Sequence, residues 1–209
     1  MSTIQIGKTS VTIDSNVITW TSGLAIDADG APNAYAPKGT PALDYLANAG
    51  HPGDWYGIVT DNGQGDGNPV VQESNDPCPG SYVSTTALVD HSRGVNDPLR
   101  YVNSSMVPYI SVPPQLRHAG VKLGDVCNVT YGCVSCAAVV ADVGPSDSIG
   151  EGSIALANTL GINGDPKHGG VSSGVSVTLW AASTQGWPRD MNDVENQVQQ
   201  LLSSAGFSV

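Results

Sequence analysis

Positive charge, aromatic rings and long apolar runs are all scarce in this sequence. Eight Lys and Arg residues stand against 19 Asp and Glu residues, so the formal net charge is −11 at pH 7. Such an acidic chain repels nucleic acids and anionic membrane surfaces, and we expect neither as a partner. No apolar run approaches the roughly 20 residues that a membrane-spanning helix needs. The acidity would attract a polycation, or it serves solubility alone.

Motifs of several well-known enzyme classes are absent as well. The four histidines show no HExxH spacing, and the chain contains no G-x-S-x-G, P-loop or dinucleotide-binding glycine motif. These absences argue against a metallohydrolase, a serine hydrolase of that type and a nucleotide-dependent enzyme. The acidic loops Asp27–Gly30 and Asp61–Asp66 do not match the twelve-residue calcium loop. We therefore expect no metal and no cofactor.

The N-terminal segment and the cysteines indicate in which cellular compartment the protein would act. Residues Met1–Ser15 contain one Lys and no apolar core segment, so no signal peptide is visible. Either a leader has been removed or export uses another route. Four cysteines (Cys78, Cys127, Cys133 and Cys136) allow two disulfides in three connectivities, and their spacing does not suit a zinc site. We expect one or two structural disulfides and an extracellular or periplasmic destination.

Glycine and proline, in contrast, are abundant. The chain has 25 Gly and 14 Pro, which is typical of a loop-rich, mainly β domain, and its length of 209 residues predicts a single domain over 1–209. Alternating apolar residues predict an N-terminal hairpin within 1–22, with its turn at Asp14–Asn16. The same alternation predicts a strand over 171–182, and helical spacing predicts a C-terminal helix over 190–206.

The middle of the chain predicts further short elements. Pro41–Gly50 has the spacing and the terminal glycine of a short helix. Trp55–Thr60 and Ser81–Leu88 have the composition of strands, and Tyr101–Val112 carries another. Gly- and Pro-rich loops separate these segments.

The stretch from residue 137 to residue 162 places two carboxylates around one loop. A wholly apolar run, Ala137–Ala141, predicts a buried strand that ends at Asp142. A Gly- and Pro-containing loop then leads to Glu151, and the apolar spacing of Ser153–Leu160 predicts a short helix that stops at Gly161. The two acids are therefore predicted at a strand end and at a helix start.

This placement suits general acid and base chemistry. Burial at the end of an apolar strand should raise the pKa of Asp142 and favour its protonated form. The helix dipole should favour the anion of Glu151. Two carboxyls whose pKa values are pushed apart form the pattern of an acid and a base. The structural alternative is that Asp142 closes a turn and Glu151 caps a helix.

Three sequence blocks occur in a fixed order: Ile26–Gly30 (IDADG), Val107–Pro113 (VPYISVP) and Ile149–Ser153 (IGEGS). They resemble the I-D-x-D-G, V-P-aromatic-I-x-(V/I)-P and I-G-E-x-S blocks of glycoside hydrolase family 75, the fungal-type chitosanases. The resemblance extends over roughly residues 24–162, about two thirds of the chain.

The resemblance implies a role for each site residue. Asp142 would be the catalytic acid and Glu151 the catalytic base of an inverting hydrolase. Asp27, Asp29, Tyr109 and Ser153 would lie at the substrate groove as binding residues. We expect Asp27 and Asp29, on either side of Ala28, to face opposite sides, one into the cleft and one into a turn.

The order of strand, loop, helix and strand around Asp142 is also similar to that of double-psi β-barrels, which include family 45 endoglucanases, expansins and bacterial lytic transglycosylases. That similarity implies a mainly β chain built on a six-stranded double-psi-like β-barrel with extra hairpins and a few short helices. In some of those relatives the base comes from an N-terminal strand, so Asp27 and Asp29 are alternatives to Glu151.

Together these observations predict an endo-acting glycoside hydrolase that cleaves β-1,4 bonds of chitosan or a related glucosamine polymer as a monomer. One alternative is a peptidoglycan-cleaving muramidase or lytic transglycosylase, since wall-targeting effectors are often delivered without a leader. Another is a non-catalytic, expansin-like wall-binding protein, which would call for an aromatic platform on a second domain. Trp55, Trp180, Trp187 and several Tyr offer rings that stack on sugars or fill the core.

Overall fold

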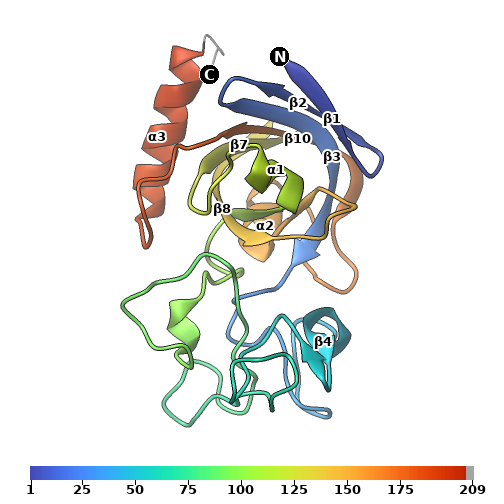
Figure 1. Ribbon diagram of the computed structural model, residues 1–209, viewed down its shortest axis with the longest axis vertical. Helices are drawn as coiled ribbons and strands as arrows, with labels where there is room; N and C mark the ends of the chain where they lie inside the picture. The colour runs from blue at the N-terminus through green and yellow to red at the C-terminus, as the bar shows by residue number, and fades with distance from the viewer. Residues whose placement is uncertain (206–209) are drawn as a thin grey trace.

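A computed structural model describes residues 1–205, and Figure 1 shows a β-barrel above a region of irregular loops. The strands are β1 (Ser2–Ile6), β2 (Thr9–Asp14), β3 (Val17–Asp27), β4 (Gly50–His51), β5 (Asp54–Trp55), β6 (Tyr109–Val112), β7 (Val126–Tyr131), β8 (Val134–Val143), β9 (Glu151–Ser153) and β10 (Val171–Trp180). The helices are α1 (Pro114–His118), α2 (Ile154–Thr159) and α3 (Met191–Ser204), with 3₁₀ turns η1 (Leu46–Ala49) and η2 (Pro98–Arg100).

Six strands close into a barrel in the order β3–β10–β7–β8–β6–β9, and β9 pairs back with β3. The pairs β3–β9 and β6–β8 are parallel, whereas the other four pairs of the ring are antiparallel. The predicted mainly β chain with a six-stranded barrel, extra strands and a few short helices is therefore confirmed. The two parallel pairs join strands that are distant in sequence, and they bring the ends of β3, β8 and β9 to one end of the barrel.

Alternation along the strands fills the barrel interior. In β10 the side chains of Val175, Val177 and Leu179 are buried, and in β3 the same period of two buries Ile18 and Trp20. Each such side chain stabilises the folded state by about 1.5–3 kcal/mol relative to an exposed position. The predicted strand over 171–182 is confirmed as β10, two residues shorter at its end.

The two ends of the chain pack outside the barrel. The turn predicted at Asp14–Asn16 joins β2 to β3, and β1 adds a further strand that pairs with β2. Helix α3 packs against the barrel through Val194 and Val198, both fully buried. Asp190 accepts a hydrogen bond from the Asn192 amide as its N-cap, which places the start of the helix as predicted. The predicted helix end at residue 206 lies outside the described residues.

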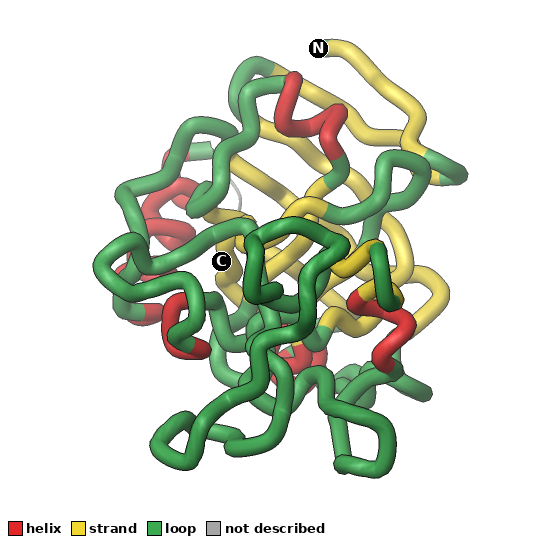
Figure 2. The backbone as a smooth tube through the Cα atoms, turned by 60° about the horizontal axis from the view of Figure 1, so that its bottom comes forward, coloured by secondary structure: helices red, strands yellow, loops and turns green. Residues whose placement is uncertain are grey.

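Residues 28–108, the loop region, contain less regular structure than their sequence predicts. The helix expected over 41–50 is reduced to η1, and the strands expected over 55–60 and 81–88 form β5 and isolated bridges such as Ile58 with Ser84. Frequent Gly and Pro residues interrupt any longer ladder here. Figure 2 shows irregular loops, in green, in front of the strands. The loop region has its own small core, which includes Tyr35 and Trp55.

The cysteines do not form the predicted disulfides: all four are free thiols. Cys127 and Cys136 lie on the neighbouring strands β7 and β8, but their register partners are Ala138 and Val129 rather than each other. Cys133 is exposed near the β7–β8 turn, and Cys78 lies in the loop region. The structure therefore gives no disulfide-based support for an oxidising destination. Among residues 1–205, no helix is long and apolar enough to cross a membrane.

Candidate active site

The two catalytic candidates lie on either side of one serine. Ser111 in β6 is the register partner of Asp142 in β8 and of Glu151 in β9. Directly opposed residues of adjacent strands present their side chains to the same face, about 5 Å apart at Cβ. A Cβ atom built on Gly144 would lie 3.1 Å from Glu151 Oε2 and 3.6 Å from Ser111 Cβ, so the loop after Asp142 folds back over this face.

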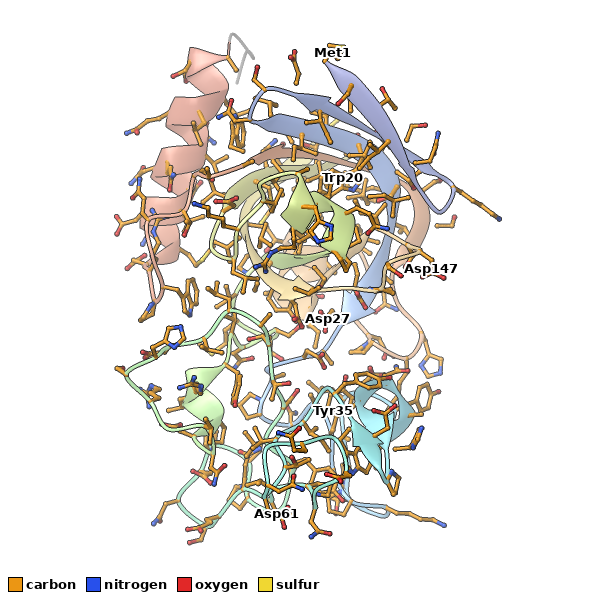
Figure 3. The ribbon with its side chains drawn as sticks, in the orientation of Figure 1. Met1, Trp20, Asp27, Tyr35, Asp61 and Asp147 are labelled. Atoms are coloured by element: carbon orange, nitrogen blue, oxygen red, sulfur yellow. The ribbon has the colours of Figure 1, made fainter. Side chains whose placement is uncertain are left out.

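Asp27 joins this group from the end of β3. Its side chain is only 8% exposed, and its Oδ2 accepts a 2.9 Å hydrogen bond from Ser111 Oγ. Its Oδ1 accepts a 2.8 Å bond from the Asp29 amide, which closes the turn that follows β3. Figure 3 shows Asp27 at the end of the barrel that faces the loop region. Ser111 therefore links the third carboxylate to the two catalytic candidates.

Asp29 lies on the same side as Asp27, contrary to the prediction that the two acids face opposite sides. The prediction was wrong because side chains two residues apart on a strand point to the same face, and the turn that follows β3 keeps Asp29 beside Asp27. Asp29 Oδ1 accepts a 2.6 Å hydrogen bond from the Tyr35 hydroxyl, and its backbone carbonyl accepts one of 3.0 Å from the Tyr109 hydroxyl. The charges of Asp27, Asp142 and Glu151 all raise the pKa of Asp29, which places the four carboxyls in one cluster.

The cluster shifts the pKa of every member upward. Burial is the largest cause for each of them, and repulsion between the carboxylates adds to it. Burial and the charge of Asp27 raise the pKa of Asp142 to about 7, and burial with the charges of Asp27 and Asp142 raises that of Glu151 to about 8. Within residues 1–205 no salt bridge reaches these four side chains. Carboxyls in this state hold protons near neutral pH.

The predicted pKa shift of Asp142 is confirmed in direction, whereas that of Glu151 is wrong. Glu151 is the first residue of β9, and α2 begins only at Ile154, with Ser153 as its N-cap. The helix terminus is therefore occupied by Ser153, and the surrounding burial and negative charge set the pKa of Glu151.

Hydrogen bonds distinguish the two catalytic candidates. Asp142 Oδ1 accepts a 2.8 Å bond from the Val143 amide and a 3.1 Å bond from the Ala87 amide. Both bonds favour its ionised form and lower its pKa against the larger effect of burial. No hydrogen bond within residues 1–205 reaches the Glu151 carboxyl. The environment of Glu151 therefore offers nothing that stabilises its anion.

A fifth carboxylate, Asp44, was not predicted as a site residue. It is buried in the loop region and held by the Asn48 side-chain amide, at 3.0 and 2.9 Å, and by the Tyr45 amide at 2.7 Å. Its charge raises the pKa of both Asp27 and Glu151. The sequence carries no local signal for this proximity, because the loop region folds back onto the barrel only in the tertiary structure.

A pocket of about 170 Å³, here called the Glu151 pocket, opens beside the cluster and is lined by Glu151, Ser111 and the two ends of the loop between β8 and β9, Gly144–Pro145 and Ser148–Gly150. Gly150, directly before Glu151, has a φ of +106°, and a Cβ atom there would lie 2.5 Å from the Gly23 carbonyl oxygen. Only glycine fits this close approach, and it sets the position from which Glu151 enters the pocket.

Tyr109 and Ser153 were predicted to bind substrate, and the structure assigns them to the core instead. Both are fully buried. Ser153 Oγ accepts hydrogen bonds from the Leu156 amide at 3.1 Å and from the Tyr109 amide at 3.0 Å, so it caps α2 and ties it to β6. The two residues support the site from beneath, out of reach of a ligand.

No group of three or more His, Cys, Asp and Glu side chains among residues 1–205 has an arrangement that could hold a metal ion. No protein-family model matches the chain, and no curated protein matches it. The resemblance to the chitosanases therefore rests on the three sequence blocks, and the chemistry of the site has to be argued from its geometry.

Proposed function

We propose that the protein is an endo-acting glycoside hydrolase that cleaves β-1,4 bonds in chitosan or a related glucosamine polymer. The observation that carries this proposal is that Asp142 and Glu151 flank Ser111, with their pKa values raised by burial and by neighbouring carboxylates to about 7 and about 8. Glu151 and Ser111 also line the Glu151 pocket. Hydrolysis of a glycosidic bond needs one protonated and one ionised carboxyl at neutral pH. Few side chains other than a buried carboxyl pair can supply both forms.

The hydrogen bonds favour Glu151 as the acid and Asp142 as the base, the reverse of the roles inferred from the sequence. Two backbone amides stabilise the Asp142 carboxylate, so it is the member of the pair that ionises first. Glu151 has no such donor and keeps its proton to higher pH. Activity should accordingly be highest between the two pKa values, near neutral pH, and fall on both sides.

In an inverting reaction Glu151 transfers its proton to the glycosidic oxygen as the bond from that oxygen to the anomeric carbon breaks. Asp142 takes a proton from the water that attacks the same carbon from the opposite face. The products are two shorter chains, and a proton exchange with solvent restores both carboxyls. This mechanism requires the two carboxyl groups to lie roughly 6.5–9.5 Å apart, with room for the water between them.

The charge of the site supports a cationic sugar. Asp27, Asp29 and Asp44 add carboxyls that no salt bridge within residues 1–205 neutralises. The chain as a whole carries a formal charge of −11. An ammonium group on the substrate would favour the ionised forms of these carboxyls when it binds. Free glucosamine residues carry such a group, whereas N-acetylated residues do not.

Substitution of the pair tests the proposal. We expect Asp142→Asn and Glu151→Gln each to lower hydrolysis of chitosan by at least about 100-fold, since each removes the proton donor or acceptor, while the circular dichroism spectrum is retained. Asp147→Asn is the matched control, because Asp147 is exposed in the same loop (Figure 3). Activity of Glu151→Gln at the wild-type level would overturn the assignment and direct attention to Asp27 or Asp29.

Two further measurements define the reaction. Nuclear magnetic resonance of fresh product should show the α-anomer from the β-linked substrate, and an initial β-anomer would exclude inversion. A parallel assay on peptidoglycan identifies the polymer: cleavage there but not of chitosan would favour the muramidase or transglycosylase alternative. Binding of either polymer without any new chain ends would favour the non-catalytic, wall-binding alternative.

A further inference from the structure

A second, larger pocket lies in the loop region and shares no residue with the Glu151 pocket. Its volume is about 460 Å³, and we call it the distal pocket. Its walls come from two segments, residues 55–65 and residues 95–101, with Thr85 between them. The Tyr101 hydroxyl donates a 2.8 Å hydrogen bond to the Val95 carbonyl, which fixes the second wall. The pocket is thus formed by loops that are held in place by their own hydrogen bonds.

Aromatic rings line this pocket. Trp55, Tyr56 and Tyr101 all contribute to its walls, although the chain has only 6% aromatic residues. Tyr56 is 66% exposed, whereas its neighbour Trp55 is buried. An exposed tyrosine ring beside a concave surface offers a flat apolar face, with little side-chain entropy to lose when a ligand stacks on it.

Polar groups complement these rings. Asp61, Gln64 and Asn96 line the pocket together with the aromatic residues. Asn68 donates one hydrogen bond to each oxygen of Asp61, through its amide and its side chain, both at 2.9 Å. These bonds lower the pKa of Asp61, so its carboxylate is charged at neutral pH. Each oxygen retains a lone pair that can accept a further hydrogen bond.

The loops of the distal pocket also connect to the carboxylate cluster. The Thr85 amide donates a 3.0 Å hydrogen bond to the Gly57 carbonyl, and a Cβ atom on Gly57 would lie 3.6 Å from Asp29 Oδ1. Two residues beyond Thr85, the Ala87 amide donates to Asp142. Figure 3 shows Asp27 at the barrel end and Asp61 at the far end of the loop region. A ligand that reached both places would have to be a long chain.

We propose that the distal pocket binds a glucosamine residue of the polymer, with its ring stacked on Tyr56 and its ammonium group on the Asp61 carboxylate. The identity of the sugar rests on the proposed function, whereas the pocket and its chemistry do not. A pyranose has apolar faces and a polar rim. A site that recognises it therefore combines aromatic rings, which stack on a face, with amide and carboxyl groups, which bond to the rim. The pocket would extend substrate binding well beyond the cleaved bond.

The test measures binding to the full-length Glu151→Gln protein, so that the ligand is not cleaved. Titration with a glucosamine tetramer, followed by amide resonances, should shift the signals of residues 61–65 and 95–96. Tyr56→Ala should weaken this binding about fivefold to tenfold, the equivalent of one aromatic contact, and Tyr56→Phe should retain it. Asp61→Asn should weaken binding of the glucosamine tetramer but leave that of the N-acetylated tetramer unchanged.

Asp14→Asn, at the exposed last residue of β2, is the matched control and should bind like the parent. The proposal would be overturned if the amide signals of the distal pocket did not shift, or if Tyr56→Ala bound the tetramer as tightly as Tyr56→Phe. This holds even if the wild type hydrolyses chitosan. If Asp61→Asn weakened the binding of both tetramers equally, the proposed contact between Asp61 and the ammonium group would be wrong. Distal shifts with the expected variant effects, in a protein whose wild type hydrolyses nothing, would uphold the site and refute the proposed enzyme.

Discussion

At the scale of the residue, the site is defined by carboxyls that lack a cationic partner. Burial raises the pKa of Asp27, Asp29, Asp142 and Glu151, and the charges of neighbouring carboxylates raise it further. Such an arrangement costs folding free energy whenever the groups ionise, and proteins retain such costs chiefly at functional sites. The hydrogen bonds from Ser111 and the backbone amides offset part of this cost for Asp27 and Asp142.

The raised pKa values predict how stability depends on pH. The folded protein keeps protons on Asp142 and Glu151 up to about pH 7 and about pH 8, whereas the unfolded chain releases them near 3.8 and 4.5. In this window the folded state binds more protons, so the free energy of unfolding falls as the pH rises. Thermal midpoints should be lower at about pH 9 than at about pH 5.

The double variant Asp142→Asn/Glu151→Gln provides the control for that prediction. It removes two of the groups that bind the extra protons, so its thermal midpoint should depend less on pH and exceed that of the wild type above about pH 8. An identical slope in wild type and variant would show that other carboxyls govern the pH dependence.

At the scale of the element, β9 and α2 hold the site together through one side chain. Ser153, two residues after Glu151, accepts hydrogen bonds from the backbone amides of Leu156 and Tyr109. It therefore joins α2 to β6. Gly150, on the other side of Glu151, has a backbone conformation that disfavours any side chain. The position of Glu151 is thus fixed from both neighbouring segments.

Ser153→Ala should destabilise the protein by about 2–4 kcal/mol, because it removes a helix cap and leaves two buried amides without an acceptor. Urea unfolding measures this change. Ser74→Ala is the matched control, since Ser74 is exposed in the loop region, and it should leave the midpoint within experimental scatter. A loss for Ser153→Ala no larger than that of the control would contradict the role given to this hydroxyl.

At the scale of the whole molecule, the barrel supplies the paired carboxylates and the loop region covers the end where they emerge. Asp44 and Ala87, both from the loop region, act on the cluster through charge and through a hydrogen bond. The net charge of −11 acts on any charged ligand that approaches the molecule. Electrostatic attraction to a cationic polymer therefore belongs to the molecule as a whole as well as to the site.

Activity on chitosan should fall as the salt concentration rises, because screening shortens the range of this attraction to about 10 Å at 0.1 M and about 3 Å at 1 M. The measurement is the initial rate on soluble chitosan at several salt concentrations. A fully acetylated oligomer, which carries no charge, serves as the control substrate and should show a smaller change. A flat salt response on soluble chitosan would show that net charge plays no part in recognition.

The sequence by itself determined the local elements and the kind of fold. Its alternating apolar residues correspond to β3 and β10, the apolar run before Asp142 corresponds to β8, and helical spacing located α2 and α3. These patterns are readable because burial on one face imposes a period of two or of about 3.6 on neighbouring residues. The loop region had no such period, and its predicted helix and strands were the least accurate.

Only the tertiary structure decided which side chains meet. The pairing of β6 with both β8 and β9 places Asp142 and Glu151 around Ser111, and the turn after β3 adds Asp27 and Asp29 to them. Tyr109 and Ser153, predicted at the surface of the groove, became buried supports. Proximity between strands depends on long-range pairing and register, whereas the sequence pattern encodes only which face of each strand is buried. The same holds for the charge of Glu151, whose pKa is raised by burial and by carboxylates from three other segments of the chain.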